Sequence, residues 1–272
     1  MSALSPTLAA AGRALLRALL TLVFVVGTVL LLWVAGLRIF EVSDYVGKGP
    51  ADVWAHLVTD EDAGQTRSEA WSLLVKTLQD AALGFVAGML AATALAGAIV
   101  LSRAVESAVL PMAMILRSVP LIALAPLIIL LVGRGYAAVA VMSGIVVLFP
   151  ALVSIVFGLR SHSAQMRDVV QVFGGSSWAV LRRVAFPSAL PALFASVRIS
   201  VPGAITGALL AEWLATGEGI GYAIVSAAAR SQINQVWSLV VVITLASLVL
   251  YLLAQLVESV VLARFGQEAG RA

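Results

Sequence analysis

The sequence predicts an all-α integral membrane protein, and three observations support this fold class. Only 11% of the 272 residues are charged, whereas soluble domains carry about a quarter of their residues as Asp, Glu, Lys and Arg. Hydrophobic residues make up 61% of the chain and gather in long runs with at most one charge. Each run reaches the roughly 20 residues that a helix needs to cross a bilayer. We therefore expect one membrane domain over residues 1–272.

Six apolar runs predict six transmembrane helices. Arg13 and Arg17 precede the first run, which is too long for the apolar core of a signal peptide and is expected to remain as an anchor. Arg117 interrupts the third run and Arg198 the fifth. The predicted spans are residues 18–38, 78–102, 107–132, 136–159, 188–214 and 235–258.

The distribution of Lys and Arg predicts that both termini face the inside of the cell. Nine basic residues fall in segments that this orientation places inside, against five outside, which agrees with the positive-inside rule. The outer loop at 41–70 is acidic and is expected to contain a short surface helix around residues 53–58. The inner loop at 160–187 is the most patterned polar segment of the chain.

The sequence lacks the residues that nucleotide or metal chemistry needs. Lys48 and Lys76 are the only lysines, and neither has the spacing of a phosphate-binding P-loop. There is no Cys, and His56 and His162 are expected on opposite sides of the membrane. The glycine cluster at 217–221 lacks the strand–turn–helix context of a phosphate site. We therefore expect no catalytic residue, no metal site and no bound cofactor in this chain.

The inner loop has a pattern typical of two short helices joined by a turn. Residues 168–173 predict a helix that Gly174 can end in the left-handed conformation. Ser176 or Ser177 can cap the next helix, which is expected to end before Pro187. An amphipathic segment of this kind suits the groove of a partner protein or the headgroup surface of the membrane.

The order of these residues resembles the EAA loop of binding-protein-dependent ABC importer permeases. Asp168 takes the place of the family's Glu, and Val169 and Val170 replace its two alanines. Gly174 and Pro187 match the family's glycine and proline.

Two further segments resemble the permease subfamily for aliphatic sulfonates, taurine, nitrate and thiamine precursors. Residues 116–127, LRSVPLIALAPL, are similar to its third-span signature, and AEWL at 211–214 with GIGY at 219–222 is similar to the end of its fifth span. The resemblance covers roughly residues 70–260. It implies the type I ABC importer permease fold in a bacterial plasma (inner) membrane.

The resemblance also implies partners. The chain would form the translocation path for a small solute as a homodimer, and an external binding protein would deliver the solute. Separate ABC ATPase subunits would bind ATP and Mg, and their groove would hold a coupling helix of the inner loop. The implied coupling residues are Asp168, Val169, Val170, Phe173, Gly174, Gly175, Ser176, Trp178, Arg182 and Pro187.

Polar and proline residues inside the spans form a second set of candidates. A charge within a membrane is costly and suggests a function. Arg117 could face an anionic solute, or it could snorkel to the boundary or pair with Glu106 or Asp168. Glu212 could be a gate, an inter-subunit contact or a simple boundary carboxylate. The candidates for the path or gate are Arg117, Pro120, Pro202, Glu212 and Trp213.

Other spacings predict contacts between and along the helices. Lys76 and Asp80 are one turn apart and are expected to form an ion pair at the outer end of the second span. Small residues at 84, 88 and 92 and at 203, 207 and 211 predict close helix packing.

A stand-alone secondary transporter or channel is the alternative function. It would need ionisable pairs inside the membrane to couple transport to a gradient, and such residues are sparse here. A scaffold without transport activity would need neither proline-kinked spans nor a patterned loop. The sequence does not identify the solute.

Overall fold

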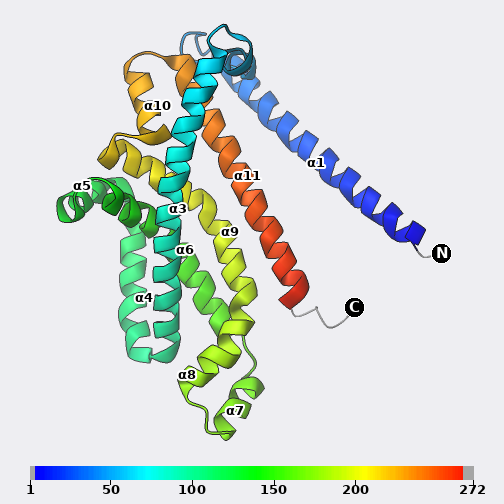
Figure 1. Ribbon diagram of the computed structural model, residues 1–272, viewed down its shortest axis with the longest axis vertical. Helices are drawn as coiled ribbons and strands as arrows, with labels where there is room; N and C mark the ends of the chain where they lie inside the picture. The colour runs from blue at the N-terminus through cyan, green and yellow to red at the C-terminus, as the bar shows by residue number, and fades with distance from the viewer. Residues whose placement is uncertain (1–3, 266–272) are drawn as a thin grey trace.

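The protein is built from helices, as a computed structural model shows (Figure 1). The structure describes the backbone of residues 4–265 and the side chains of residues 20 and 23–263, except that of Arg117. Every regular element in this described part is helical, which confirms the predicted fold class. The helices are α1 (Leu4–Ile39), α2 (Pro50–Trp54), α3 (Ala63–Leu101), α4 (Arg103–Ser118), α5 (Leu121–Val132), α6 (Tyr136–Arg160), α7 (Ala164–Val172), α8 (Ser177–Val180), α9 (Phe186–Ala211), α10 (Gly219–Ala229) and α11 (Ile233–Phe265). The π-helical turns are Ala55–Thr59, Leu181–Ala185 and Glu212–Thr216.

Four helical segments in the described part of the chain are long and apolar enough to cross a membrane. They are Ala63–Leu101, Tyr136–Arg160, Ser177–Thr216 and Ile233–Ala263. Helices α4 and α5 give a fifth crossing if they count as one span. The predicted first span lies in α1, where several side chains fall outside the described residues. The total of six spans therefore stays a prediction.

Helices α4 and α5 meet at an angle of 111° instead of forming one straight helix over the predicted third span. Val119 between them is extended, with φ −82° and ψ 124°. The physical reason is Pro120, because the ring of a proline disfavours the helical region for the residue before it. Pro202 has a different effect, since it lies inside the continuous helix α9.

The two ends of the bundle are called the inner end and the outer end, after the predicted orientation. The inner end carries α7 and α8, at the bottom of Figure 1, and the outer end carries α2, the start of α3 and α10. Helix α1 diverges from the other helices towards its N-terminus (Figure 1). At the outer end Trp33 of α1 stacks on Trp237 of α11, with ring centroids 5.4 Å apart. The Trp237 indole also donates to the Val46 carbonyl (2.9 Å), which ties the outer loop to α11.

The outer loop contains the short helix that the sequence predicts. Helix α2 and the π-turn after it cover residues 50–59. Pro50 occupies the first helical position, where its missing N–H has no partner to lose. The Asp52 carboxylate accepts a hydrogen bond from the Gly49 amide (2.7 Å) and completes the cap.

The core is the three-helix contact of α3, α6 and α9, and Ser143 of α6 lies at its centre. Ser143 is fully buried, and its hydroxyl donates to the Ala204 carbonyl of α9 (2.9 Å). Gly84 of α3 and Gly207 of α9 approach Ser143 so closely that a Cβ on either glycine would overlap it. Gly88 packs in the same way against Gly144 and Val147. The structure thus confirms that Gly84, Gly88 and Gly207 have a packing role.

We expect Gly207→Ala to destabilise the protein by about 2 kcal/mol, in the range measured for overpacked cores. The new Cβ would lie 2.5 Å from the Ser143 Cα, so α6 and α9 would have to separate. The matched control is Gly97→Ala, where the nearest atom, on Leu181, lies 3.9 Å from the new Cβ. Thermal unfolding in detergent measures the difference. Equal midpoints for the two variants would show that the α6–α9 contact is not close-packed.

Candidate functional site

The inner loop forms two capped helices at the inner end. The Ser163 hydroxyl accepts a hydrogen bond from the Met166 amide (3.3 Å) and caps α7. Helix α7 therefore begins at Ala164, before the predicted helix at 168–173. Gly174 follows α7 with φ +78°, a left-handed conformation that favours glycine, as predicted. The Ser176 hydroxyl then accepts from the Ala179 amide (3.4 Å) and caps α8.

The prediction that the second loop helix ends before Pro187 is wrong. The π-turn Leu181–Ala185 connects α8 directly to α9, and Pro187 lies in the first turn of α9. The wider turn just before Pro187 accommodates the proline ring, which would clash in a regular α-helix. The inner loop is therefore rigidly joined to the span that follows it.

The turn between α7 and α8 exposes large apolar side chains. Phe173 is 87% exposed and Trp178 is 60% exposed. Val170 is only half-buried, but it packs against Gly175, whose amide donates to the Val170 carbonyl (2.8 Å). We call the exposed apolar group the docking face; it consists of Met166, Val169, Val172, Phe173 and Trp178.

Exposed charges lie on the same segment of the chain as the docking face. The Arg167 guanidinium pairs with the Asp168 carboxylate at 3.2 Å, with both side chains about half exposed. Arg182 is also exposed. A surface ion pair contributes little to stability, so these charges are available to steer or orient a partner. An apolar centre with a charged rim is the usual anatomy of a protein–protein interface.

The predicted path residues whose side chains the structure describes lie in different parts of the chain. Arg117 ends near the C-terminus of α4, but its side chain lies outside the described residues. Pro120 is at the α4–α5 break. Pro202 borders a groove of about 390 Å³ between α9 and α11 that Tyr251 also lines. Trp213 is partly exposed beside Glu212 at the outer end.

The two partners proposed for Arg117 are engaged elsewhere. Glu106 pairs with Arg160 at 2.7 Å, which ties the start of α4 to the end of α6. Asp168 pairs with Arg167.

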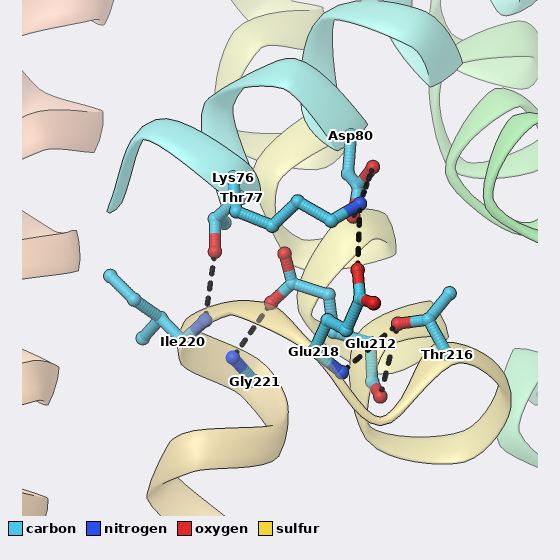
Figure 2. A network of polar contacts seen from close by, with 8 residues as sticks. All are labelled: Lys76, Thr77, Asp80, Glu212, Thr216, Glu218, Ile220 and Gly221. Carbon is cyan, nitrogen blue, oxygen red and sulfur yellow. Dashed lines mark hydrogen bonds and ion pairs between the residues drawn. The ribbon is translucent and has the colours of Figure 1, made fainter. Parts of the chain in front are cut away.

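Glu212 is the centre of a polar network at the outer end (Figure 2). It begins the π-turn after α9, and its side chain is fully buried (0% exposed). Its Oε2 atom accepts a hydrogen bond from the Gly221 amide of α10 (2.7 Å). The Ile220 amide donates to Thr77 Oγ1 of α3 (2.9 Å). Two amides in the first turn of α10 are therefore satisfied by side chains from other elements.

Lys76 joins the same network from α3. Its ammonium lies 2.9 Å from the Asp80 carboxylate, which confirms the predicted pair. It also lies 3.4 Å from the carboxylate of Glu218, just before α10. The ring of Tyr136, at the start of α6, is 4.9 Å from the ammonium. Spacing along α3 gave the Asp80 contact, but nothing in the sequence indicated the contacts with Glu218 and Tyr136.

A second charged cluster, which sequence reasoning missed as a unit, connects α9 and α11. Arg198 Nε lies 2.6 Å from Glu258 Oε2, and another guanidinium nitrogen donates to the Tyr251 hydroxyl (3.0 Å). The Arg198 and Glu258 side chains are 27% and 11% exposed. A charge inside each of two apolar runs was a visible signal, but their pairing depends on how the helices cross.

The chain matches a known protein family over most of its length. Residues 84–266 match the family described as "binding-protein-dependent transport system inner membrane component". The match includes the docking face, Glu212 and the Arg198–Glu258 pair. It begins after Lys76, Thr77 and Asp80.

Individual relatives agree with this match. The chain is 30% identical over 233 residues to a probable ABC transporter permease protein of Haemophilus influenzae, which covers 86% of this chain and 93% of the relative. It is 34% identical over 118 residues to a formylaminopyrimidine transport permease protein of Halalkalibacterium halodurans (43% and 47%). It is 29% identical over 177 residues to a putative aliphatic sulfonates transport permease protein of Bacillus subtilis (64% and 63%).

Proposed function

Because the chain belongs to the family of binding-protein-dependent transport system inner membrane components, the ABC permeases for import of small solutes, we propose how this multi-pass inner membrane protein works. Two copies form the translocation path. An external binding protein delivers the solute at the outer end. A separate ATPase binds the inner end and drives transport.

The docking face is the observation that carries this proposal. Its apolar side chains point away from the helices of their own chain, and burying them would stabilise a complex. Hydroxyl caps and the left-handed Gly174 hold α7 and α8 in one shape, so little order has to be gained on binding. The segment from Asp168 to Trp178 is thus suited to a groove of an ATPase.

The connection between the loop and the spans supports a coupling role. Helix α8 continues through the π-turn into α9 without an interruption. A displacement of the docked loop therefore moves α9, which carries Pro202 and leads directly into the π-turn that begins at Glu212. ATP and Mg bind the partner ATPase in this proposal, because the sequence of this chain has no P-loop.

The solute is a small molecule of the kind that the binding protein selects. The relatives named above are called permeases for formylaminopyrimidine and for aliphatic sulfonates, which differ in charge and shape. Similarity to such different permeases favours selection outside this chain. The path itself then needs only modest selectivity.

Purification of the chain from its native membrane in mild detergent tests the proposal. We expect an ATPase with a P-loop to co-purify in about equal amount, and the co-purifying proteins are identified by mass. A homogeneous preparation without an ATPase would contradict the proposal. It would favour a stand-alone carrier and direct attention to Arg198 and Glu212.

A further inference from the structure

Helix α10 depends on other elements for the capping of its N-terminus. Glu218 stands at the capping position, but its side chain makes no capping hydrogen bond. Thr77 of α3 and Glu212 at the end of α9 accept the amide hydrogens of Ile220 and Gly221 instead. The start of α10 is therefore held in place only while it lies against α3 and the end of α9.

The contacts of this network differ in how easily they break. Thr77, Asp80 and Glu212 are fully buried, so separating them from their partners leaves buried polar groups unsatisfied. Glu218 is 64% exposed, and its carboxylate meets Lys76 at the surface (Figure 2). Water can replace either partner there, so this ion pair is weaker than the buried contacts of the network.

The Lys76–Glu218 contact is reachable from outside. A pocket of about 320 Å³ lies beside it at the outer end. Its lining residues include Arg134, Tyr136 and Thr216 as well as the ion pair itself. A molecule that approaches this end therefore meets the weak contact before any buried one.

The backbone on both sides of Glu218 suits a hinge. Gly217 and Gly219 have φ values of +75° and +76°, in the region that favours glycine. At Gly219 a Cβ would also overlap the Glu212 carboxylate. The backbone on either side of Glu218 can thus rotate at Gly217 and Gly219 and carry the Glu218 carboxylate away from Lys76. This rotation forces no residue with a side chain into a strained backbone conformation.

We propose that Lys76 is a positioning residue that holds α10 in its closed place, with Glu218 as its releasable partner. Asp80 keeps the Lys76 ammonium in position when Glu218 leaves. The first turn of α10 then separates from Thr77 and Glu212, and the outer end opens. The inference rests on the proposed function, because it makes α10 the outer closure of the solute path.

The chain has no native cysteine, so a single introduced thiol reports the position of α10. Ala81 is buried on α3, one turn after Thr77 and in the same apolar cluster as Ile220. The full-length chain with Ala81→Cys is reconstituted in lipid nanodiscs, and the rate of labelling by a hydrophilic maleimide is measured. Labelling is slow while this cluster is closed, and we expect it to become faster when α10 lifts and withdraws Ile220 from the cluster.

We expect Glu218→Gln to raise the labelling rate about two- to fivefold, the increase in the open population that loss of one exposed ion pair gives. Lys76→Arg keeps the positive charge and should stay near the wild-type rate, whereas Lys76→Met should raise it at least as much as Glu218→Gln. The matched control is Glu61→Gln, an exposed carboxylate at the outer end with no ion pair to a described side chain.

Two results would overturn the proposal. One is an unchanged labelling rate in Glu218→Gln. The other is an equal increase at Ala92→Cys, buried on α3 in the cluster near the inner end, since this would mean general loosening. The experiment uses this chain alone. If Glu218→Gln leaves the labelling rate unchanged while an ATPase still co-purifies with the chain, the inference about α10 is contradicted. The proposed function then remains intact.

Discussion

Replacing Phe173 and Trp178 together by alanine is expected to reduce the affinity for the ATPase by on the order of 100- to 1000-fold. A central aromatic residue of an interface contributes about 2 kcal/mol or more, and two such losses give this range. Both side chains project from the docking face and are mostly exposed, so their removal leaves no cavity in this chain. The amount of ATPase that co-purifies with the variant measures the effect.

The control for this experiment is the double variant Trp54→Ala and Trp71→Ala. These two tryptophans are also mostly exposed (63% and 66%), but they lie at the outer end, on α2 and near the start of α3. It should retain the ATPase at the level of the unmodified chain. If the Phe173 and Trp178 variant also retained it, the docking face would not be the contact surface.

Replacing Glu258 by glutamine is expected to destabilise the fold by about 2–4 kcal/mol. The substitution leaves the Arg198 guanidinium between α9 and α11 without its charged partner, 2.6 Å away in the native protein. Breaking a buried ion pair from one side typically costs about 3–5 kcal/mol, and the partial exposure of Arg198 lowers this figure. The hydrogen bond to Tyr251 offsets only part of the loss. Unfolding by increasing denaturing detergent measures the change.

Two comparisons separate the pair from its surroundings. The double variant Arg198→Gln and Glu258→Gln should be more stable than Glu258→Gln alone, because it leaves no unpaired charge between the helices. Glu106→Gln breaks the more exposed pair with Arg160 and should cost about 1 kcal/mol or less. A Glu258→Gln variant as stable as Glu106→Gln would show that the α9–α11 pair lies in water rather than between helices.

The features that could be predicted from the sequence depend on neighbouring residues. The apolar runs gave the helices, because each run satisfies its own backbone hydrogen bonds. Gly174 and Ser176 indicated the loop turn, since a left-handed residue and a hydroxyl cap act within a few positions. The Lys76–Asp80 pair followed from one helical turn. The π-turn before Pro187 was missed, because residue patterns do not distinguish it from an α-helical turn.

The sequence by itself thus determined the helical membrane fold class, the turn between the two helices of the inner loop and the small-residue packing positions. Only the tertiary structure decided that Ile220 meets Thr77, 143 positions earlier, and that Arg198 meets Glu258. These contacts depend on how far α3, α9, α10 and α11 are shifted and rotated against one another. Many packings of apolar helices bury similar surface. The observed packing pairs the first amides of α10 with Thr77 and Glu212, and Arg198 with Glu258, and no local pattern of residues specifies these partners.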